Sequence, residues 1–326
     1  MAKTSKAASL ARALVRITDH REFMLIYIIV LGVIGLWHAA PNFLDPTSIS
    51  AVLLSLSDRS IIAIGMTILL VSGAFDLSVG STLALSGAVT AIWINSGTPV
   101  PLAIALGLSV GVLIGLINGL IITKIGINPF ITTLGMMSLV RGLVLVISGT
   151  TISGLPASFT QIGQGKVLGI QYPILISLAL VVVGHLLLSK SRFFRQNYYI
   201  GGNEKAARLS GINVGRMKVF NFALVGFLAA LAGIISTARH GSAATTAGMG
   251  LELEVISAVI IGGASLRGGE GTIFGAFLGA LLMAIITSSI YLLGIDASWN
   301  SFVLGAALLL AVMADVMSKR QKKLAA

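Results

Sequence analysis

Residues 201–212 read Gly-Gly-Asn-Glu-Lys-Ala-Ala-Arg-Leu-Ser-Gly-Ile and predict a short helix that lies outside the lipid bilayer. The side chain of Asn203 can cap the start of this helix. Glu204 stands at the positive end of the helix dipole and four residues before Arg208, the favourable order for an ion pair on one face. Gly211 can supply the left-handed conformation that ends a helix. A helix of about two turns is marginal alone, so we expect it to pack against other parts of a protein.

This segment lies in the most basic stretch of a very apolar chain. Seven Lys and Arg residues fall between Lys190 and Lys218, whereas 56% of the 326 residues are hydrophobic and 10% are charged. The mean hydropathy is +0.99. Such a composition excludes an ordinary soluble domain and indicates an integral membrane protein. We therefore interpret residues 190–218 as a large cytoplasmic loop whose helix meets a cytoplasmic protein.

Apolar segments of about 20 residues, the length needed to cross a bilayer, recur along the whole chain. We predict ten spans in a single bundle, so the expected fold is an all-α membrane protein. The eighth segment is too short to cross as a straight apolar helix and is expected to be tilted, broken or re-entrant. The predicted spans are residues 24–39, 51–71, 77–96, 100–123, 129–148, 172–189, 217–238, 252–266, 271–293 and 298–316.

Lys and Arg residues predict how the spans are oriented, because they favour cytoplasmic loops. The basic N-terminal segment, residues 1–22, is placed in the cytoplasm, and an even number of spans returns the basic tail, residues 319–326, to the same side. Between them we expect one transmembrane domain, residues 23–318. The loops expected outside are residues 40–50, 149–171 and 239–251.

The net charge of +11 lies mainly at the two ends and in the central loop. In a membrane protein this distribution favours contact with anionic lipid and argues against nucleic-acid binding. The chain has no cysteine, which excludes disulfides and thiolate metal sites, and we predict no metal site.

Two glycine-rich joints interrupt the spans. Residues 72–81 read Ser-Gly-Ala-Phe-Asp-Leu-Ser-Val-Gly-Ser and join the second and third spans, and residues 262–271 join the eighth and ninth. Neither contains the Gly-Lys-Ser/Thr ending of a phosphate-binding loop, and no such ending occurs elsewhere, so the chain itself should not hydrolyse ATP.

Glycines also recur within spans at the spacing of one helix face, which predicts close helix–helix packing. The fourth span carries Gly107, Gly111 and Gly115, and the ninth carries Gly275 and Gly279.

Ionisable residues within predicted spans are costly in lipid and usually have a partner or a function. Asp58 and Arg59 are adjacent in sequence, so their side chains point about 100° apart on a helix, and we expect each to pair with another helix. Arg141 is interpreted as structural and His185 as a satisfied buried histidine. Asp76 either caps the third span or lines a path for a solute.

Residues 201–212, together with Phe75-Asp76-Leu77-Ser78-Val79-Gly80-Ser81, resemble the ribose-type permease family of ABC importers. The joint at residues 262–269 resembles a third signature of that family, and the resemblance extends from about residue 24 to residue 316. It implies a multi-pass permease of the bacterial inner membrane, with ten helices in the larger vitamin-B12-type importer fold. Two copies would work as a homodimer with two ATPase subunits and a periplasmic sugar-binding protein to import a pentose or hexose. ATP and Mg would be held by the ATPase, and this chain would need no cofactor.

The resemblance also implies that the short helix is a coupling helix seated in a groove of the ATPase. A bulky or charged replacement of Ala206 or Ala207 should then uncouple ATP hydrolysis from uptake without unfolding the protein. The residues assigned to coupling are Gly201, Gly202, Asn203, Glu204, Ala206, Ala207, Arg208, Leu209 and Gly211.

A neutral sugar needs hydroxyl and amide partners without a deep trap for charge. The candidates for the substrate path are Phe75, Asp76, Ser78, Ser81, Asn118, Asn128, Thr132 and Thr133. For the two Asn and two Thr residues, hydrogen bonding between helices is the alternative interpretation. The pattern Ala74-Phe75 replaces the Gly-Ile usual in the family, and the added bulk of Phe75 favours a substrate other than ribose. We expect Asp76→Ala to impair uptake and leave assembly intact.

Charged side chains beside the loop of residues 239–251 have two interpretations. They can pair with charges on the binding protein, or they can reach toward lipid headgroups. These side chains are Arg239, His240, Glu252 and Glu254.

Three other functions remain in view. A permease of the same class could carry a nucleoside or a branched-chain amino acid. An ion-coupled secondary transporter would also have broken helices, but it would need no ATPase. A structural or receptor membrane subunit would have no path for a solute. Co-purification of an ATPase subunit would separate the first class from the second.

Overall fold

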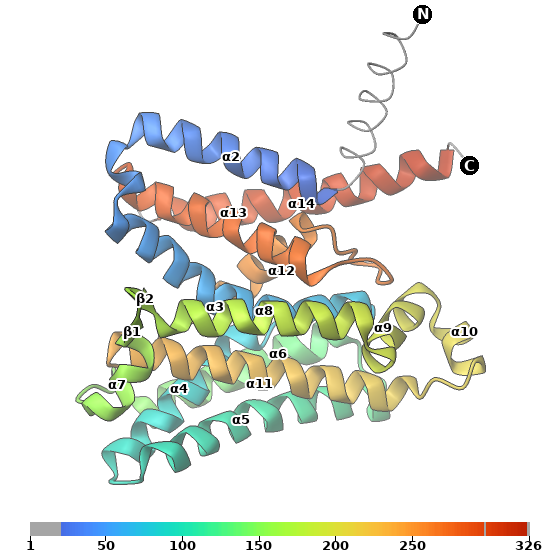
Figure 1. Cartoon of the computed structure of the whole chain (residues 1–326). Helices are drawn as coiled ribbons and strands as arrows, with labels where there is room; N and C mark the ends of the chain where they lie inside the picture. Colours follow the sequence, from blue (N-terminus) through green and yellow to red (C-terminus); the bar gives the residue numbers. More distant parts are fainter. Residues whose placement is uncertain (1–20, 297, 325–326) are drawn as a thin grey trace, which may run out of the picture.

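The computed structural model describes residues 21–296 and 298–324, and helices make up most of this part of the chain (Figure 1). A 3-10 turn, η1 (Pro41–Leu44), a π-helical segment, η2 (Ile121–Ile125), and a small antiparallel hairpin of β1 (Lys166–Val167) and β2 (Ile170–Gln171) complete it. The helices are α2 (Arg21–Ala39), α3 (Pro46–Val71), α4 (Val79–Asn95), α5 (Val100–Leu120), α6 (Pro129–Ser148), α7 (Ala157–Gln164), α8 (Tyr172–Lys190), α9 (Arg192–Gly202), α10 (Glu204–Leu209), α11 (Val214–His240), α12 (Leu251–Ile261), α13 (Ile273–Leu292) and α14 (Trp299–Leu324).

Each predicted span contains a helix, but the helices differ in their capacity to cross a membrane. In the described part of the chain, seven helical stretches are long and apolar enough: residues 22–39, 46–71, 100–125, 129–148, 172–190, 214–240 and 273–292. The apolar helices 79–95 and 299–313 are shorter. Helix α12 has 11 residues, about 16 Å of helix, which agrees with the expected break in the eighth span.

Several helices depart from the predicted spans by three residues or more: α2 begins at Arg21, α3 begins at Pro46 and α14 continues to Leu324. The boundaries of α11 and α12 also differ. Helix α11 begins at Val214 and not at residue 217, because the side chain of Asn213 accepts a hydrogen bond from the backbone N–H of Arg216 and caps an earlier start. Helix α12 ends at Ile261 and not at residue 266, because the glycine-rich joint begins there.

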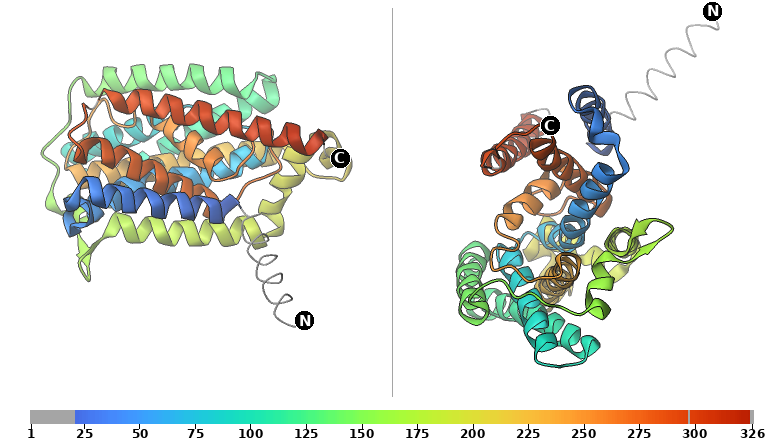
Figure 2. Two further views of the ribbon diagram at one scale, coloured as in Figure 1. Left: turned by 90° about the horizontal axis from the view of Figure 1, so that it is seen from above. Right: turned by 90° about the vertical axis from the view of Figure 1, so that its left-hand side faces the viewer.

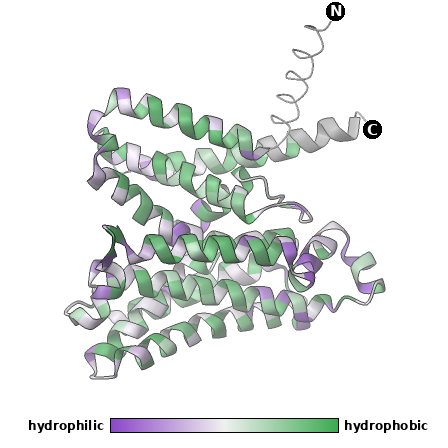
Figure 3. Ribbon diagram, in the orientation of Figure 1, coloured by the Kyte–Doolittle hydropathy of each residue, from purple (hydrophilic) through white to green (hydrophobic). Residues whose placement is uncertain are grey.

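The two ends of the bundle carry different elements (Figures 1 and 2). Helices α9 and α10 lie at one end, and α7 and the hairpin lie at the other. Helix α14 ends on the same side as α9 and α10, as the positive-inside prediction requires for the central loop and the tail. Figure 3 shows apolar residues along the helices and polar residues gathered near α9 and α10. The predicted basic residues of segment 1–20 lie outside the described residues.

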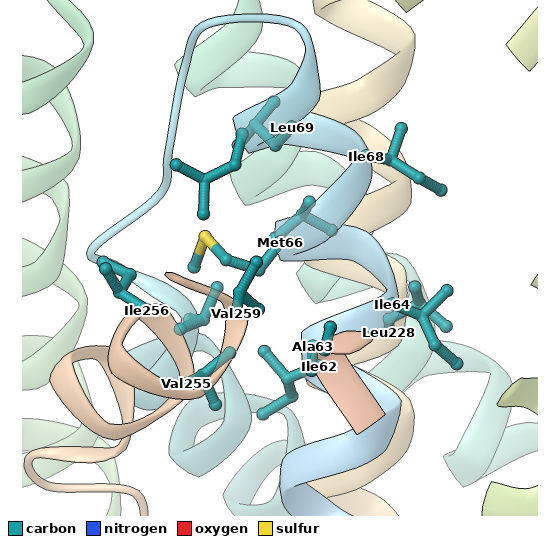
Figure 4. Packing of buried hydrophobic residues seen from close by; sticks show 14 of the residues in the cluster. Ile62, Ala63, Ile64, Met66, Ile68, Leu69, Leu228, Val255, Ile256 and Val259 are labelled. Atoms are coloured by element: carbon teal, nitrogen blue, oxygen red, sulfur yellow. The ribbon is translucent and has the colours of Figure 1, made fainter. Parts of the chain in front are cut away.

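Helix α3 forms the centre of the bundle, and its second half is buried almost continuously from Leu56 to Val71. Figure 4 shows side chains such as Met66 packed with Val255 and Val259 of α12. Lipid is as apolar as these side chains, so close van der Waals packing, rather than transfer out of water, stabilises such contacts.

Glycine lets α5 and α11 cross with their backbones in contact. A Cβ atom added to Gly111 would collide with the carbonyl oxygen of Gly226, and one added to Gly226 would collide with that of Gly111. Gly115 meets the backbone of Phe222 in the same way. The packing role predicted for the spaced glycines is therefore confirmed at this crossing.

The segment 241–250 does not form the outer loop that the sequence predicted. Ile152 and Ala243 exchange backbone hydrogen bonds of 3.0 and 2.8 Å at its start, but the chain then turns inward. Gly248 lies against the backbone of Gly80 in the first turn of α4. The absence of side chains on these two glycines permits this contact, so α4 and α12 begin side by side within the bundle.

We predict that Gly111→Ala lowers the free energy of unfolding by about 1–3 kcal/mol, because its methyl group overpacks the crossing. Thermal unfolding of the purified protein in detergent measures this as a lower midpoint. Gly32→Ala is the matched control, since a Cβ there meets nothing within 4 Å. Equal midpoints for the two variants would contradict the prediction.

Candidate functional site

Helix α10 has the termini that its sequence predicts. Asn203 Oδ1 accepts a hydrogen bond of 3.0 Å from the backbone N–H of Ala206. Glu204 Oε1 accepts one of 2.7 Å from Arg208 Nη2. Gly211 has a φ of 84°, in the left-handed region. The capped helix over residues 203–210 is therefore confirmed as a local structure.

A second cation, which the sequence analysis did not identify, ties α10 to α11. Lys218 Nζ donates a hydrogen bond of 2.7 Å to Glu204 Oε2. This bond, followed by that from Arg208, holds the pKa of the Glu204 carboxyl below its ordinary value, although burial opposes the shift. The carboxylate thus keeps its charge and its bond to α11 at neutral pH, and loses them only in acid. Lys218 is far from Glu204 in sequence, so helix spacing gave no signal for this pair.

The two alanines proposed for coupling lie on different faces of α10. Ala207 is 3% exposed and packs in a small apolar cluster with Ile200, Val214 and Met217. Ala206 and Leu209 are exposed, Leu209 by 90%. A bulky residue at position 207 would therefore disturb the seat of α10 itself, which makes Ala206 and Leu209 the residues available to a partner.

A pocket of about 410 Å³ opens beside α10. It combines apolar and aromatic walls with the start of the capped helix. Its lining residues are Tyr198, Tyr199, Gly202, Asn203, Ala206, Ala207, Ser210 and Ile212. Four of the nine residues assigned to coupling, Gly202, Asn203, Ala206 and Ala207, thus line one concave surface.

Residues 192–202 form a second helix of the loop 190–218, α9, in addition to the predicted short helix. Asn197 Oδ1 accepts a buried hydrogen bond of 2.7 Å from Asn221 Nδ2 on α11. Tyr198 donates one of 2.8 Å to the carbonyl oxygen of Gly271. These contacts fix α9, and with it the start of α10, to the membrane helices.

Both glycine-rich joints meet the end of α9. The backbone of Gly201 lies against the carbonyl of Val71 and the backbone of Gly268 and Gly269, and Gly268 also lies close to Gly73. Gly269 donates a backbone hydrogen bond of 2.9 Å to Val71. We call Gly73, Gly201, Gly268 and Gly269 the glycine junction. It brings together three segments that the sequence analysis treated separately.

Asp76 lies in a buried polar network and is not the cap of α4. Its Oδ1 accepts hydrogen bonds from the backbone N–H of Ser78, at 2.7 Å, and from the Ser78 hydroxyl, at 2.6 Å. Asn118 Nδ2 donates to Asp76 Oδ2 and Ser78 Oγ at 3.3 and 3.0 Å. The structure thus brings together three of the predicted path residues, which hydrogen-bond to one another, while Asn118 Oδ1 is buried with no partner in the described residues.

The other predicted path residues do not join this network. Asn128 caps α6 by accepting from the backbone N–H of Phe130 at 2.8 Å, and the ring of Phe75 lies 6.3 Å from that of Phe130. Thr133 donates to a carbonyl of its own helix. Thr132 is buried, and its hydroxyl has no partner within the described residues. The eight predicted residues are therefore divided among several places.

The adjacent charges Asp58 and Arg59 each pair with a different helix, as their spacing predicted. Asp58 Oδ2 lies 2.7 Å from Arg239 Nη2 on α11, and Arg59 binds Glu254 on α12. Arg239 and Glu254 therefore face inward, and the interpretation that they reach a binding protein or lipid headgroups is wrong. The side chain of His185 is half-buried, and its ring packs against Phe274.

Comparison of the sequence with known proteins shows the family of this chain. Residues 48–312 match the family model described as branched-chain amino acid transport system / permease component. The chain belongs to this family. It is 44% identical over 295 residues to the ribose import permease protein of Bacillus subtilis, covering 90% of each chain. It is 38% identical over 309 residues to the L-arabinose transport system permease protein of Escherichia coli, covering 94% of each.

The ribose import permease protein of Haemophilus influenzae is 39% identical, with 91% of this chain and 93% of the relative covered. No solved structure matches the chain. The relatives match over nearly their whole length, so the resemblance expected from the three motifs is confirmed for the family. These relatives and the apolar helices support the prediction of a multi-pass protein of the bacterial inner membrane.

We predict that Asp76→Ala destabilises the protein, because in a buried site it removes the acceptor of the N–H and the hydroxyl of Ser78 and one of the two acceptors of the Asn118 amide. Each such loss costs about 1–3 kcal/mol. Asp76→Asn, which keeps an acceptor oxygen, should recover much of the thermal midpoint. If Asp76→Ala unfolds like the unmodified protein but fails in uptake, the path interpretation of Asp76 replaces the structural one.

Proposed function

We propose that this chain is the membrane-spanning permease subunit of an ATP-driven importer that passes a pentose or hexose into the cell. The observation that carries the proposal is the match, over 90% or more of the chain, to permeases named for ribose and L-arabinose. These relatives are transport subunits, and the chain is accordingly not an enzyme. ATP and Mg are held by a separate ATPase subunit.

We also propose the finer architecture that the family resemblance implies. The chain crosses the membrane ten times in the larger, vitamin-B12-type importer fold, with both ends in the cytoplasm. The short α12 crosses together with the inward-folded segment 241–250 that precedes it. The arrangement of α14, which ends on the side of α9 and α10, supports this count (Figure 1). The pairing of two copies as a homodimer rests on the family resemblance alone.

The proposed partners meet opposite ends of the bundle. An ATPase subunit seats α10 through the exposed Leu209 and the pocket beside Ala206. A periplasmic sugar-binding protein meets the end formed by α7 and the hairpin. Closure of the ATPase dimer on ATP then favours one arrangement of α10 over another, and a difference in binding free energy between two states is what drives such a change.

The contacts of α10 and of the adjoining α9 connect a movement of α10 to the membrane helices. The ion pair of Glu204 with Lys218 links α10 directly to α11. The glycine junction links the end of α9 to α3 and to the joint before α13. The permease thus transmits the movement through its helices, and ATP is hydrolysed in the ATPase subunit.

Other solutes of the same transport class remain the second candidate. The family model is described by branched-chain amino acid transport, which keeps such a substrate in view. The curated relatives cited above carry sugar names, and they favour a monosaccharide over an amino acid or a nucleoside. An ion-coupled carrier or a receptor subunit lacks this support.

We predict that Leu209→Glu reduces sugar uptake and its associated ATP hydrolysis by about tenfold or more, because it places a charge in the apolar centre of the contact. The measurement uses vesicles that contain the permease with its ATPase and binding protein. Leu209→Met is the matched control of similar volume. Both variants should unfold at the same temperature, since Leu209 is exposed. Normal uptake by Leu209→Glu would contradict the coupling role of α10.

The substrate class is tested in the same vesicles with labelled ribose, L-arabinose and leucine. We expect ATP-dependent uptake of at least one pentose or hexose. Uptake of leucine alone would replace the sugar by an amino acid without changing the proposed mechanism.

A further inference from the structure

A second polar site lies between α4, α6 and the start of α12. Its lining includes none of the residues of the Asp76 network. It is a cavity of about 180 Å³ lined by Ser81, Met137, Ser138, Arg141, Met249, Gly250 and Glu252. Residues 137–141 occupy the middle of α6, which runs from residue 129 to residue 148. If α6 crosses the bilayer as its length indicates, this cavity lies near the midplane. We call it the midplane cavity.

The backbone around the midplane cavity is unusual for a membrane protein. Helices α4 and α12 both begin here, where Gly80 and Gly248 meet. Non-helical backbone at membrane depth is tolerated only where protein buries it or where it lines a polar cavity. Broken helices of this kind surround solute sites in transport proteins in general. The inward fold of segment 241–250 therefore creates a polar surface that a continuous helix would not provide.

Arg141 and Glu252 are the two charged residues that line the midplane cavity. Arg141 Nη1 donates hydrogen bonds of 2.8 and 2.9 Å to the carbonyl oxygens of Thr245 and Ala247. Its other N–H groups have no hydrogen-bond partner in the described part of the chain. Arg141 and Glu252 attract each other electrostatically, but they do not form a direct ion pair like those of Arg59 with Glu254 or Asp58 with Arg239. Arg141 thus has unused N–H donors at the midplane cavity, and the Glu252 carboxylate, which accepts from the backbone N–H groups of Gly250 and Glu252, can accept further hydrogen bonds.

Two hydroxyl groups and two methionines complete the lining. Ser81 donates to the carbonyl oxygen of Met137 at 2.9 Å, and Ser138 makes only a long bond of 3.3 Å to the carbonyl oxygen of Leu134. Both hydroxyl oxygens can still accept a hydrogen bond. Met137 and Met249 offer flexible apolar surface beside them. Hydroxyl, guanidinium, carboxylate and thioether groups in one cavity match the polar hydroxyls and apolar C–H faces of a sugar ring.

We propose that the midplane cavity is a contact site for the sugar during its passage, with Arg141 donating to sugar hydroxyls and Glu252 accepting from them. This inference rests on the proposed function and deepens it. The cavity is smaller than the roughly 300–1,000 Å³ of pockets that hold ligands tightly. A small, partly open site binds weakly, which suits a solute that must leave again. The sugar path is thus assigned to residues of α6 and α12 in place of Asn128, Thr132 and Thr133.

The natural absence of cysteine makes a direct test possible. In Ser138→Cys, the one thiol of the chain would lie at the midplane cavity, and the substitution disturbs only the long bond to Leu134. We expect a membrane-impermeant thiol reagent to label it in vesicles that contain the ATPase and binding protein. Excess ribose or L-arabinose should slow this labelling, and the attached group should block later uptake.

Val146→Cys is the matched control on the same helix. Val146 is 81% exposed and lies beyond the cavity lining, so its label should leave uptake unchanged and its labelling rate should not respond to sugar. Labelling of Ser138→Cys that neither responds to sugar nor affects uptake would overturn the proposal. So would failure to label Ser138→Cys in every nucleotide state.

Glu252→Gln provides a second measurement that does not depend on the label. It keeps the size of the side chain but removes a charged acceptor, and the number of sugars moved per ATP hydrolysed should fall about tenfold. An unchanged thermal midpoint would separate this loss from misfolding. Unchanged transport would contradict the role of Glu252.

The failure of this inference can be distinguished from the failure of the proposed function. If the unlabelled Ser138→Cys complex still transports a sugar and attachment of the label leaves that transport unchanged, the midplane cavity is not the contact site. If the unmodified complex transports no pentose or hexose but transports another solute, the proposed sugar function is wrong.

Discussion

The contact on which the rest of the account depends is made by backbone atoms without intervening side chains. Gly201, at the end of α9, lies against the carbonyl of Val71 and the backbone of Gly268 and Gly269. The backbone N–H of Gly269 is satisfied by Val71. Backbone N–H and C=O groups that are buried where helices end must find partners in the protein itself. The glycine junction meets this requirement for two helix breaks at once, and it sets α10 in place as a consequence.

A central helix distributes these constraints through the bundle. Helix α3 ends at the glycine junction, and in its middle Asp58 and Arg59 form ion pairs with α11 and α12. Removing one member of such a buried pair is costly because it leaves a charge without compensation. Helix α11, in turn, binds Glu204 of α10 through its own Lys218 and crosses α5 at Gly226. The cytoplasmic helix is therefore connected to the interior by short, directional contacts.

Local patterns predicted the helices, the capped α10, the glycine crossing and the divergence of Asp58 and Arg59, because each follows from the geometry of one helix. Contacts between distant segments could not be predicted in this way. The pairing of Lys218 with Glu204 and the glycine junction depend on how α9 packs. The inward fold of residues 241–250 was missed because their small residues also suit an exposed loop. The polar residues near Asp76 were identified by type, but their type did not reveal that Asp76, Ser78 and Asn118 hydrogen-bond to one another.

The measurement that tests the central claim most directly compares ATP hydrolysis and sugar uptake in vesicles that contain Gly201→Ala. Its Cβ would collide with the carbonyl of Val71, whereas Gly202→Ala, the control, places a Cβ where nothing lies within 4 Å. We predict that Gly201→Ala still binds its ATPase and hydrolyses ATP but transports little sugar, and that Gly202→Ala transports normally. Full uptake by a folded Gly201→Ala would show that the glycine junction does not connect the coupling helix to the path.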